Sequence, residues 1–585
     1  MSKTLAPGIV ARLRTHLDRL YPPSETEDAA QRLAAACERF TATYPHLSEG
    51  GSPELFDETD VVLITYADQI REPGRAPLQT LRRFLRDHLS GVMTGVHLLP
   101  FYPWTSDDGF AVVDYRRVDP SVGLWEDVRA LGGDVRLMVD AVVNHVSAES
   151  HWFARWRAGD AAHDGWFIDL HPDTDVSGVT RPRPQPLLTA FETARGLRHV
   201  WTTFSPDQVD LDYTNPEVLL AVTDVLLFYV ANGARIIRLD AVAYLWKRLG
   251  TSCIHLPETH EVIRLWRTIL DAVAPGTLVI TETNVPHAEN VSYFGNGSDE
   301  AHLVYQFPLA PLVLSAFHLA DTTTLQEWAS GLSTPSDSTA FFNFLGSHDG
   351  VGVRPAEGLL TPSEIAQLCH LATAHGGGVS YKANPDGGMS PYELNTVYFD
   401  ALTEVDSVEP QSVQVDRFLS AQSILLALAG VPGIYVQALL GSRNWHRGVE
   451  QTGRLRSINR RKFDRGTLEA ELADPSTQRS QVFRRLRDRI RVRTGEPAFH
   501  PNGPQRILPT APGVFAFTRT TPDASHSVIC LHSVSGREQM CVVDGAHGAY
   551  ADLITGQPYR ADAAGGLAVS LPPYGVRWLR QTSGA

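Results

Sequence analysis

The chain has 585 residues, of which 43% are hydrophobic and 20% are charged, and its formal net charge is -15. This length predicts a large catalytic core with smaller domains attached, and the composition is that of an ordinary soluble globular protein. The negative charge, with no basic stripe along the chain, argues against nucleic acid as a partner.

Residues 1–60 are expected to form an N-terminal helical extension. Apolar residues recur at helical spacing around Leu13 and again around Leu33, which predicts two amphipathic helices. Proline and glycine at residues 22–23 and 48–53 break the pattern and mark the ends of these helices.

From residue 61 to residue 500, short apolar runs alternate with amphipathic stretches. This alternation predicts an α/β fold with a parallel sheet covered by helices, and eight strands favour a closed (β/α)8 TIM barrel over an open sheet. Polar residues gather where the strands end, at the face where such a barrel places its active site. The expected strands are Val61–Tyr66, Gly95–Pro100, Val135–Val142, Ala234–Leu239, Thr277–Thr281, Leu303–Phe307, Ala340–Leu345 and Gly433–Val436.

Two long stretches interrupt the barrel pattern. Residues 146–211 (insertion B) follow the third strand and residues 351–415 (insertion B') follow the seventh, and loops this long are usually functional or form small subdomains. Residues 501–585 contain β-rich segments without intervening helices and predict an antiparallel C-terminal β domain. Its expected strand segments are Val514–Thr518, Ser527–Val534 and Leu567–Leu579.

The cysteines and the N-terminus bear on location. Five cysteines are scattered, odd in number and without metal-ligand spacing, which is typical of reduced and mostly buried thiols. The segment from Met1 to Pro7 lacks an apolar core of signal-peptide length, and no later run could span a bilayer. We therefore expect a cytoplasmic protein without a membrane partner. The sequence leaves open whether it forms a homodimer.

The most informative segment follows the fourth strand. Side chains alternate along a strand, so Arg238 and Asp240 point to the same side at its C-terminal end. A cation beside a carboxylate holds the carboxylate ionised, as a nucleophile requires. A second acid, Glu282, ends the next strand. Two such carboxylates with a guanidinium between them suit covalent glycosyl transfer.

The strand ends resemble the α-amylase clan of retaining glycosidases and transglycosidases. Four segments, in the right order and each closing a predicted strand, match that clan: Asp140–His145, Arg235–Asp240, Ile280–Glu282 and Phe344–Asp349. A finer resemblance is to the sucrose phosphorylase subfamily, through Leu63–Asp68, Val96–Phe101, Gly250–Cys253 and Ile458–Arg460. Within it, Glu282–His287, Val379–Lys382 and the long N-terminus are most similar to the glucosylglycerate phosphorylases.

The resemblance implies that Asp240 is the nucleophile, Glu282 the general acid/base and Asp349 the stabiliser of the transition state. Retaining chemistry needs the first two carboxyl groups about 5–5.5 Å apart. We expect burial near other carboxylates to raise the pKa of Glu282, and Arg238 to keep Asp240 charged. The alternative is that these acids are solvated strand ends or a structural ion pair.

The resemblance also implies a closed subsite for one terminal glucose. Asp107 and Arg456 would pair behind the sugar and exclude polymer cleavage, and Phe110 would pack on the sugar's apolar face. Asp140 and Asn144 would organise the site. Three further residues would line the subsite: His145, His348 and Gln208. For the histidines and the phenylalanine, the alternative is a purely structural role.

The acceptor side separates a phosphorylase from a hydrolase. By resemblance, Arg183 and Tyr244 contact phosphate, and an arginine suits an oxyanion because its planar fork offers two aligned donors. Asn284 stands where sucrose phosphorylases have a histidine, and Glu393 where they have a glutamine. A carboxylate there would repel phosphate unless turned away or neutralised by Lys382, which is otherwise a solvated loop residue.

These departures favour a small hydroxylated acceptor such as glycerate, whose carboxylate would pair with Arg183 or Lys382. The sequence therefore predicts a retaining α-glucoside phosphorylase that converts 2-O-α-D-glucosylglycerate and phosphate into α-D-glucose 1-phosphate and D-glycerate, with no metal and no organic cofactor. The alternatives are sucrose, sucrose 6'-phosphate or glucosylglycerol as donor, an α-glucosidase-type hydrolase, and a non-catalytic member of the clan.

Overall fold

The computed structural model describes residues 5–49, 55–384 and 387–582. Its centre is a closed barrel of eight parallel strands whose order around the barrel follows the order along the chain. The expected (β/α)8 barrel is confirmed, and each expected strand overlaps an observed one. The strands are β1 (Val62–Thr65), β3 (Gly95–Leu98), β4 (Arg136–Val142), β10 (Ala234–Asp240), β11 (Leu278–Thr281), β12 (Leu303–Tyr305), β13 (Ala340–Asn343) and β17 (Val431–Tyr435).

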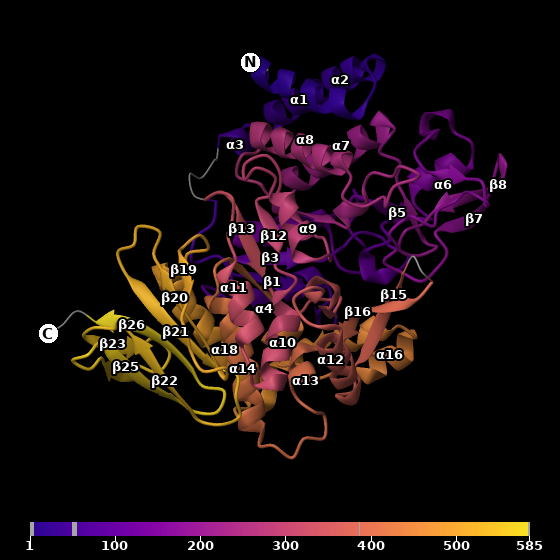
Figure 1. Cartoon of the computed structure of the whole chain (residues 1–585). Helices are drawn as coiled ribbons and strands as arrows, with labels where there is room; N and C mark the ends of the chain where they lie inside the picture. The colour runs from indigo at the N-terminus through magenta and orange to yellow at the C-terminus, as the bar shows by residue number, and fades with distance from the viewer. Residues whose placement is uncertain (1–4, 50–54, 385–386, 583–585) are drawn as a thin grey trace.

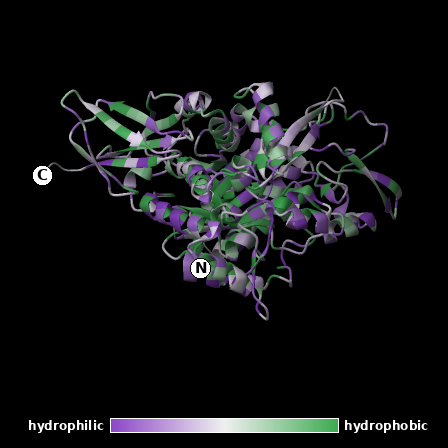
Figure 2. Ribbon diagram, turned by 90° about the horizontal axis from the view of Figure 1, so that it is seen from below, coloured by the Kyte–Doolittle hydropathy of each residue, from purple (hydrophilic) through white to green (hydrophobic). Residues whose placement is uncertain are grey.

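The barrel closes because its strands are short, apolar and buried on both faces. Helices surround it, and hydrophobic residues gather toward the middle of the ribbon in Figure 2. At one point the interior is so tight that only glycine fits, since a Cβ on Gly433 would lie 2.3 Å from the ring of Phe342. The outer helices include α4 (Pro77–His88), α5 (Trp125–Asp134), α7 (Pro216–Ala231), α8 (Pro257–Val273), α10 (Leu309–Leu319), α14 (Gln411–Ala427) and α18 (Gln478–Thr494).

The N-terminal segment lies across the outside of helices α7 and α8 (Figure 1). It forms α1 (Pro7–Leu20), α2 (Pro23–Thr43) and a short α3 (Pro45–Ser48). Leu13 and Leu17 are fully buried, and His16 and Arg19 reach Glu261 of α8 at 2.6 and 3.0 Å. Burial and these polar contacts hold the segment to the barrel. Residues 50–53 of the expected second break lie outside the described residues.

Insertions B and B' both contain short antiparallel sheets. Insertion B, with the end of the preceding segment, holds β5 (His145–Ser147), α6 (His151–Arg157), β6 (Asp169–Leu170), β7 (Leu188–Thr193), β8 (Gly196–Trp201) and β9 (Gln208–Asp210). Insertion B' holds β14 (Val351–Gly352), α12 (Pro362–Ala374), β15 (Gly378–Ala383), β16 (Met389–Asn395) and α13 (Tyr398–Leu402). The two insertions meet where the guanidinium of Arg183 lies 5.1 Å from the ring centre of Tyr392.

The C-terminal part is antiparallel, as expected, but richer in strands than the sequence indicated. The segment Leu567–Leu579 is two strands separated by a turn at Pro572–Gly575, because prolines cannot continue a ladder there. The strands are β19 (Gln505–Ile507), β20 (Val514–Thr520), β21 (Ser527–Ser533), β22 (Gln539–Asp544), β23 (Ala549–Asp552), β24 (Pro558–Arg560), β25 (Gly566–Leu571) and β26 (Val576–Thr582).

The helices and cysteines complete the picture. Among the described residues, no helix combines the length and the apolar character needed to cross a membrane. All five cysteines are buried and free, which confirms the expectation of buried thiols.

The docking of α1 gives a stability prediction. Replacing Leu17 with Ala should lower the free energy of unfolding by about 2–5 kcal/mol, because it removes a fully buried side chain between α1 and α8. Urea unfolding followed by fluorescence measures the change. The matched control is Asp18→Ala, an exposed neighbour expected to change stability by less than about 0.5 kcal/mol. Equal stability of the two variants would contradict the packing.

Candidate active site

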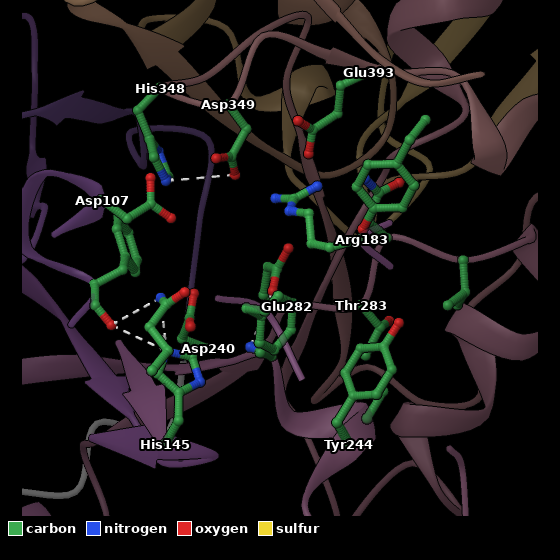
Figure 3. A pocket seen from close by; sticks show the side chains of 18 of the residues that line it. Asp107, His145, Arg183, Asp240, Tyr244, Glu282, Thr283, His348, Asp349 and Glu393 are labelled. Carbon is green, nitrogen blue, oxygen red and sulfur yellow. Dashed lines mark hydrogen bonds and ion pairs between the residues drawn. The ribbon is translucent and has the colours of Figure 1, made fainter. Parts of the chain in front are cut away.

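One cavity opens at the C-terminal ends of the barrel strands. Of the fourteen site residues expected from the sequence, twelve line it: Asp107, Phe110, His145, Arg183, Gln208, Asp240, Tyr244, Glu282, His348, Asp349, Glu393 and Arg456. Arg238 lies under the floor, and Lys382 lies outside the lining. Figure 3 shows the lining side chains converging from the barrel and from both insertions.

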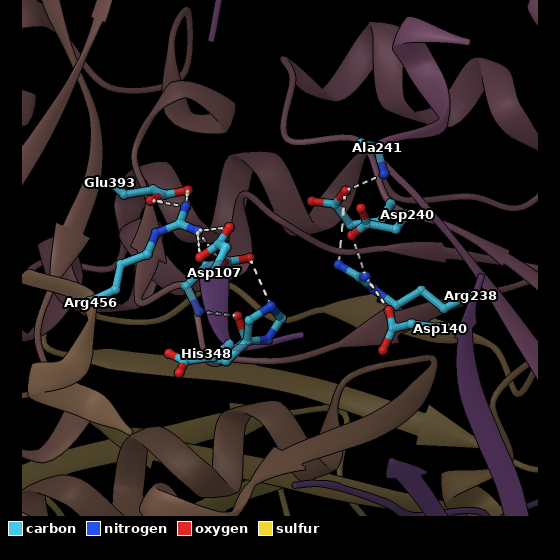
Figure 4. A network of polar contacts seen from close by, with 12 residues as sticks. Asp107, Asp140, Arg238, Asp240, Ala241, His348, Glu393 and Arg456 are labelled. Atoms are coloured by element: carbon cyan, nitrogen blue, oxygen red, sulfur yellow. Dashed lines mark hydrogen bonds and ion pairs between the residues drawn. The ribbon is translucent and has the colours of Figure 1, made fainter. Parts of the chain in front are cut away.

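The floor is organised by Arg238 on β10. Its Nη1 donates to Asp140 on the neighbouring strand β4 and to Asp240 Oδ1 at 2.7 Å (Figure 4). His97 on β3 supports Asp140 from the other side, with Nε2 2.8 Å from Oδ2. Although burial alone would raise it, Arg238 and His97 hold the pKa of Asp140 below its usual range. Asp140 therefore serves as a fixed anion that orients the guanidinium.

Glu282 reaches the same guanidinium from the end of β11. Its Oε2 lies 3.8 Å from Arg238 Nη2 and accepts a hydrogen bond of 3.0 Å from the backbone N–H of Ala241. Ala241 can aim that N–H because its φ is 50°, a left-handed conformation that costs a non-glycine residue roughly 1–2 kcal/mol. Asp240 and Glu282 thus contact the two Nη atoms of one side chain and face one cavity.

Asp240 and Glu282 lie at different distances from the guanidinium of Arg238, whose positive charge lowers their pKa values against the effect of burial. Burial raises the pKa of both groups, and Arg238 opposes this at each. Arg238 lies closer to Asp240, at 2.7 Å, than to Glu282, at 3.8 Å. Asp349 and Glu393 raise the pKa of Glu282 further. Glu282 and Asp140 likewise raise the pKa of Asp240, which lies well above its usual range, so the expectation that Arg238 keeps Asp240 ionised is not confirmed. The raised pKa expected for Glu282 is confirmed.

A second arginine closes the opposite end of the cavity. Arg456 forms ion pairs with three carboxylates, at 3.4 Å to Asp107, 3.0 Å to Asp349 and 2.7 Å to Glu393 (Figure 4). Burial alone would raise the pKa of Asp349, but His348 and Arg456 hold it well below its usual range. Of the two conditions that the sequence left open for Glu393, neutralisation by Lys382 is not seen, because Arg456 supplies the countercharge.

Between these two clusters lies an aromatic and amide wall. The ring of Phe110 stacks on His348, with centroids 4.8 Å apart and planes at 5°. His145 Nε2 lies 3.0 Å from the Phe110 carbonyl oxygen and 3.1 Å from Gln208 Nε2. Below the wall, Asn144 donates to Asp210 at 2.9 Å. The polar groups of this wall are held in place by contacts with one another.

The open side of the cavity is formed by the insertions. Arg183 packs over the ring of Tyr392, and Tyr244 faces both Arg183 and Glu282. Burial raises the pKa of Tyr244, so its hydroxyl stays protonated and can donate. Lys382 sits apart, with Nζ 4.0 Å from Glu357 Oε1.

Asn284 and Gly352 meet at the same open side. Asn284 Oδ1 is buried and has no hydrogen-bond partner among the described residues. A Cβ on Gly352 would lie 2.8 Å from that oxygen, so the backbone of insertion B' presses directly on the asparagine amide. The side chain at position 284 is therefore confined between the cavity and β14.

Several lining residues escaped the sequence analysis, among them Phe204 and Tyr392. Both lie inside the insertions, where the sequence has no barrel-strand end that would indicate a site residue. Arg460 is a different case, because it belongs to a segment already matched to the subfamily. Its Nε donates to the His348 carbonyl at 2.9 Å and its Nη1 to Asp108 at 2.5 Å, so it fixes the loops that carry the cavity wall.

No group of three or more His, Cys, Asp and Glu side chains among the described residues is arranged to hold a metal ion.

Replacing Arg238 with Gln should lower the free energy of unfolding by about 3–5 kcal/mol, because it leaves Asp140 and Asp240 buried without their cation. Chemical denaturation measures the loss. The control is Arg235→Gln on the same strand, which has no carboxylate partner in the described structure and should stay within about 0.5 kcal/mol of the parent. A loss no larger than in the control would show that Arg238 is dispensable for the floor.

Comparison with known proteins places this geometry in a family. The model of the α-amylase catalytic domain matches residues 88–354. A glucosylglycerate phosphorylase of Spirochaeta thermophila is 49% identical over 97% of this chain and 98% of its own length. One of Escherichia coli is 44% identical over 97% of this chain and 100% of its own length.

A solved structure is similar throughout. The crystal structure of sucrose 6F-phosphate phosphorylase from Thermoanaerobacter thermosaccharolyticum is 25% identical, with a TM-score of 0.70 over 88% of this chain and 98% of that chain. The barrel, the order of the matching segments and the full-length identity to curated relatives agree, and the chain belongs to the glucosylglycerate phosphorylase family of α-amylase-type proteins.

Proposed function

We propose that the protein is a retaining α-glucoside phosphorylase that converts 2-O-α-D-glucosylglycerate and phosphate into α-D-glucose 1-phosphate and D-glycerate. One observation carries this proposal: Asp240 and Glu282 contact the two ends of the Arg238 guanidinium inside one cavity. The names of relatives 44% and 49% identical over nearly the whole chain support the choice of substrate.

The reaction proceeds by two displacements. Asp240 attacks the anomeric carbon while Glu282 gives its proton to the glycosidic oxygen, which requires carboxyl groups about 5–5.5 Å apart. Their shared contact with one guanidinium fits that separation. D-Glycerate leaves, and phosphate attacks the glucosyl-enzyme from the same face, aided by Glu282 as base. The anomeric configuration is retained, and no metal or organic cofactor takes part.

The closed end of the cavity fits a single glucosyl unit. Arg456 and Asp107 would bind its far hydroxyls, and Asp349 would hold hydroxyls as the ring flattens toward an oxocarbenium ion. A further four residues would position the ring: Phe110, His145, Gln208 and His348. Because the Arg456 cluster blocks this end, internal bonds of a polymer cannot enter.

The open end suits anions. Arg183 and Tyr244 would bind the incoming phosphate. Free buried cysteines support a reducing compartment, and we propose the cytoplasm as the location.

A donor panel tests the proposal. The protein is incubated with phosphate and glucosylglycerate, sucrose, sucrose 6'-phosphate or glucosylglycerol, and glucose 1-phosphate is measured. Glucosylglycerate should give the highest kcat/KM, because only its acceptor combines small size with a carboxylate. Asp240→Asn should lower turnover at least about 1000-fold while the protein stays folded.

Three outcomes would contradict the proposal. Preference for another donor would change the substrate, and glucose release at the same rate without phosphate would indicate a hydrolase. Retained turnover in Asp240→Asn would remove this residue from the nucleophile role.

The raised pKa of Glu282 makes a pH prediction. Phosphorolysis needs this group protonated, so its rate is full below the raised pKa and falls as pH rises through it. Glu393 raises that pKa, so Glu393→Gln should lower it and move the alkaline limb of the kcat/KM profile to lower pH. Glu404→Gln, an exposed acid of the same insertion, is the control. A limb unmoved in Glu393→Gln would show that another group sets it.

A further inference from the structure

Two guanidiniums near the open end of the cavity lack a carboxylate partner, although the chain carries a net charge of -15. Neither Arg183 nor Arg354 forms an ion pair with a carboxylate of the described residues. Arg354 Nε is also buried without a hydrogen-bond partner in the described structure. A partly buried cation left unpaired in an acidic protein is available for an anion from outside.

The fold delivers Arg354 to the acceptor side. It follows β14, which pairs antiparallel with β16 through Gly352 opposite Glu393, and the backbone N–H of Val353 donates to the Tyr392 carbonyl at 3.0 Å. The backbone of Arg354 therefore lies beside β16, and the Tyr392 ring of this strand packs under the guanidinium of Arg183.

Tyr244 interacts electrostatically with both guanidiniums. Burial raises the pKa of Tyr244, and Arg354 and then Arg183 oppose the rise, Arg354 also through a side-chain hydrogen bond. Tyr244 lines the cavity opposite Glu282, the group that protonates the departing oxygen.

Nearby charges leave Arg354 available. Glu289 lies 3.0 Å from His255, and Glu357 lies 4.0 Å from Lys382. Burial lowers the pKa of Lys382, Glu357 acts against this, and Arg354 lowers it further. Lys382 has a carboxylate beside it and Arg354 does not.

We propose that Arg354 is the specificity-determining cation of the acceptor subsite, which binds the acceptor carboxylate so that anionic acceptors are selected over neutral ones. In glucosylglycerate the carboxylate is attached to the carbon that bears the glycosidic oxygen. It therefore lies two bonds from the glycosidic oxygen that Glu282 would protonate, and in this proposal Arg354 binds it while Arg183 binds phosphate. The inference rests on the proposed function and extends it to a residue outside the cavity lining.

The reverse reaction tests it with defined probes. Glucose 1-phosphate is the donor, and kcat/KM is measured for D-glycerate and for glycerol, with hydrolysis by water as a second neutral reference. In Arg354→Ala the ratio of glycerate to neutral acceptor should fall about 10-fold to 100-fold, the effect of losing a hydrogen bond to a charged group. Arg354→Lys keeps the positive charge but loses the planar pair of donors, so the ratio should fall less in this variant.

Controls separate the inference from general damage. Arg447→Ala removes an exposed arginine elsewhere and should leave the ratio unchanged, and thermal melting of each variant reports folding. If Arg354→Ala does not fold, the ratio in Arg354→Lys decides.

An unchanged ratio, or an equal loss with glycerate and with the neutral acceptors, would overturn the role of Arg354. If the unaltered protein transfers glucose to glycerol but not to glycerate, the proposed function itself fails, and this inference fails with it.

Discussion

A single buried guanidinium determines the geometry of the site. Strand alternation puts Arg238 and Asp240 on one side of β10, and the parallel register sets Arg238 directly beside Asp140 of β4. Because an unpaired buried charge is costly, each partner restricts the position of the other. The same side chain then reaches Glu282 from β11. Three neighbouring strands thereby fix the positions of Asp240 and Glu282.

The charge distribution of the cavity follows from this arrangement. Five carboxylates line the cavity: Asp107, Asp240, Glu282, Asp349 and Glu393. Such a wall suits a developing positive charge on the sugar ring but repels phosphate and glycerate. Arg456 neutralises the closed end, whereas the cations of the two insertions are concentrated at the open end. The neutralised closed end therefore suits a neutral sugar, and the cationic open end suits an anionic acceptor.

The sequence predicted best what the barrel strands dictate. Periodicity alone located Asp240 and Glu282 at neighbouring strand ends, because a strand fixes the direction of each side chain. Partners set by long insertions were not predictable in this way. Glu393 pairs with Arg456 and not with Lys382, and Phe204 and Tyr392 line the cavity from within insertions B and B'. In the C-terminal part, the apolar segment Leu567–Leu579 had suggested one continuous element, but the turn at residues 572–575 divides it into two strands.

The contact between Gly352 and Asn284 has a structural consequence. By resemblance, Asn284 of this chain stands where sucrose phosphorylases have a histidine, and a Cβ on Gly352 of β14 would lie 2.8 Å from its Oδ1. A bulkier side chain there requires the neighbouring loop to retreat, and that loop also carries Arg354. A change of the side chain at position 284, which follows β11, is therefore coupled to a change in insertion B'.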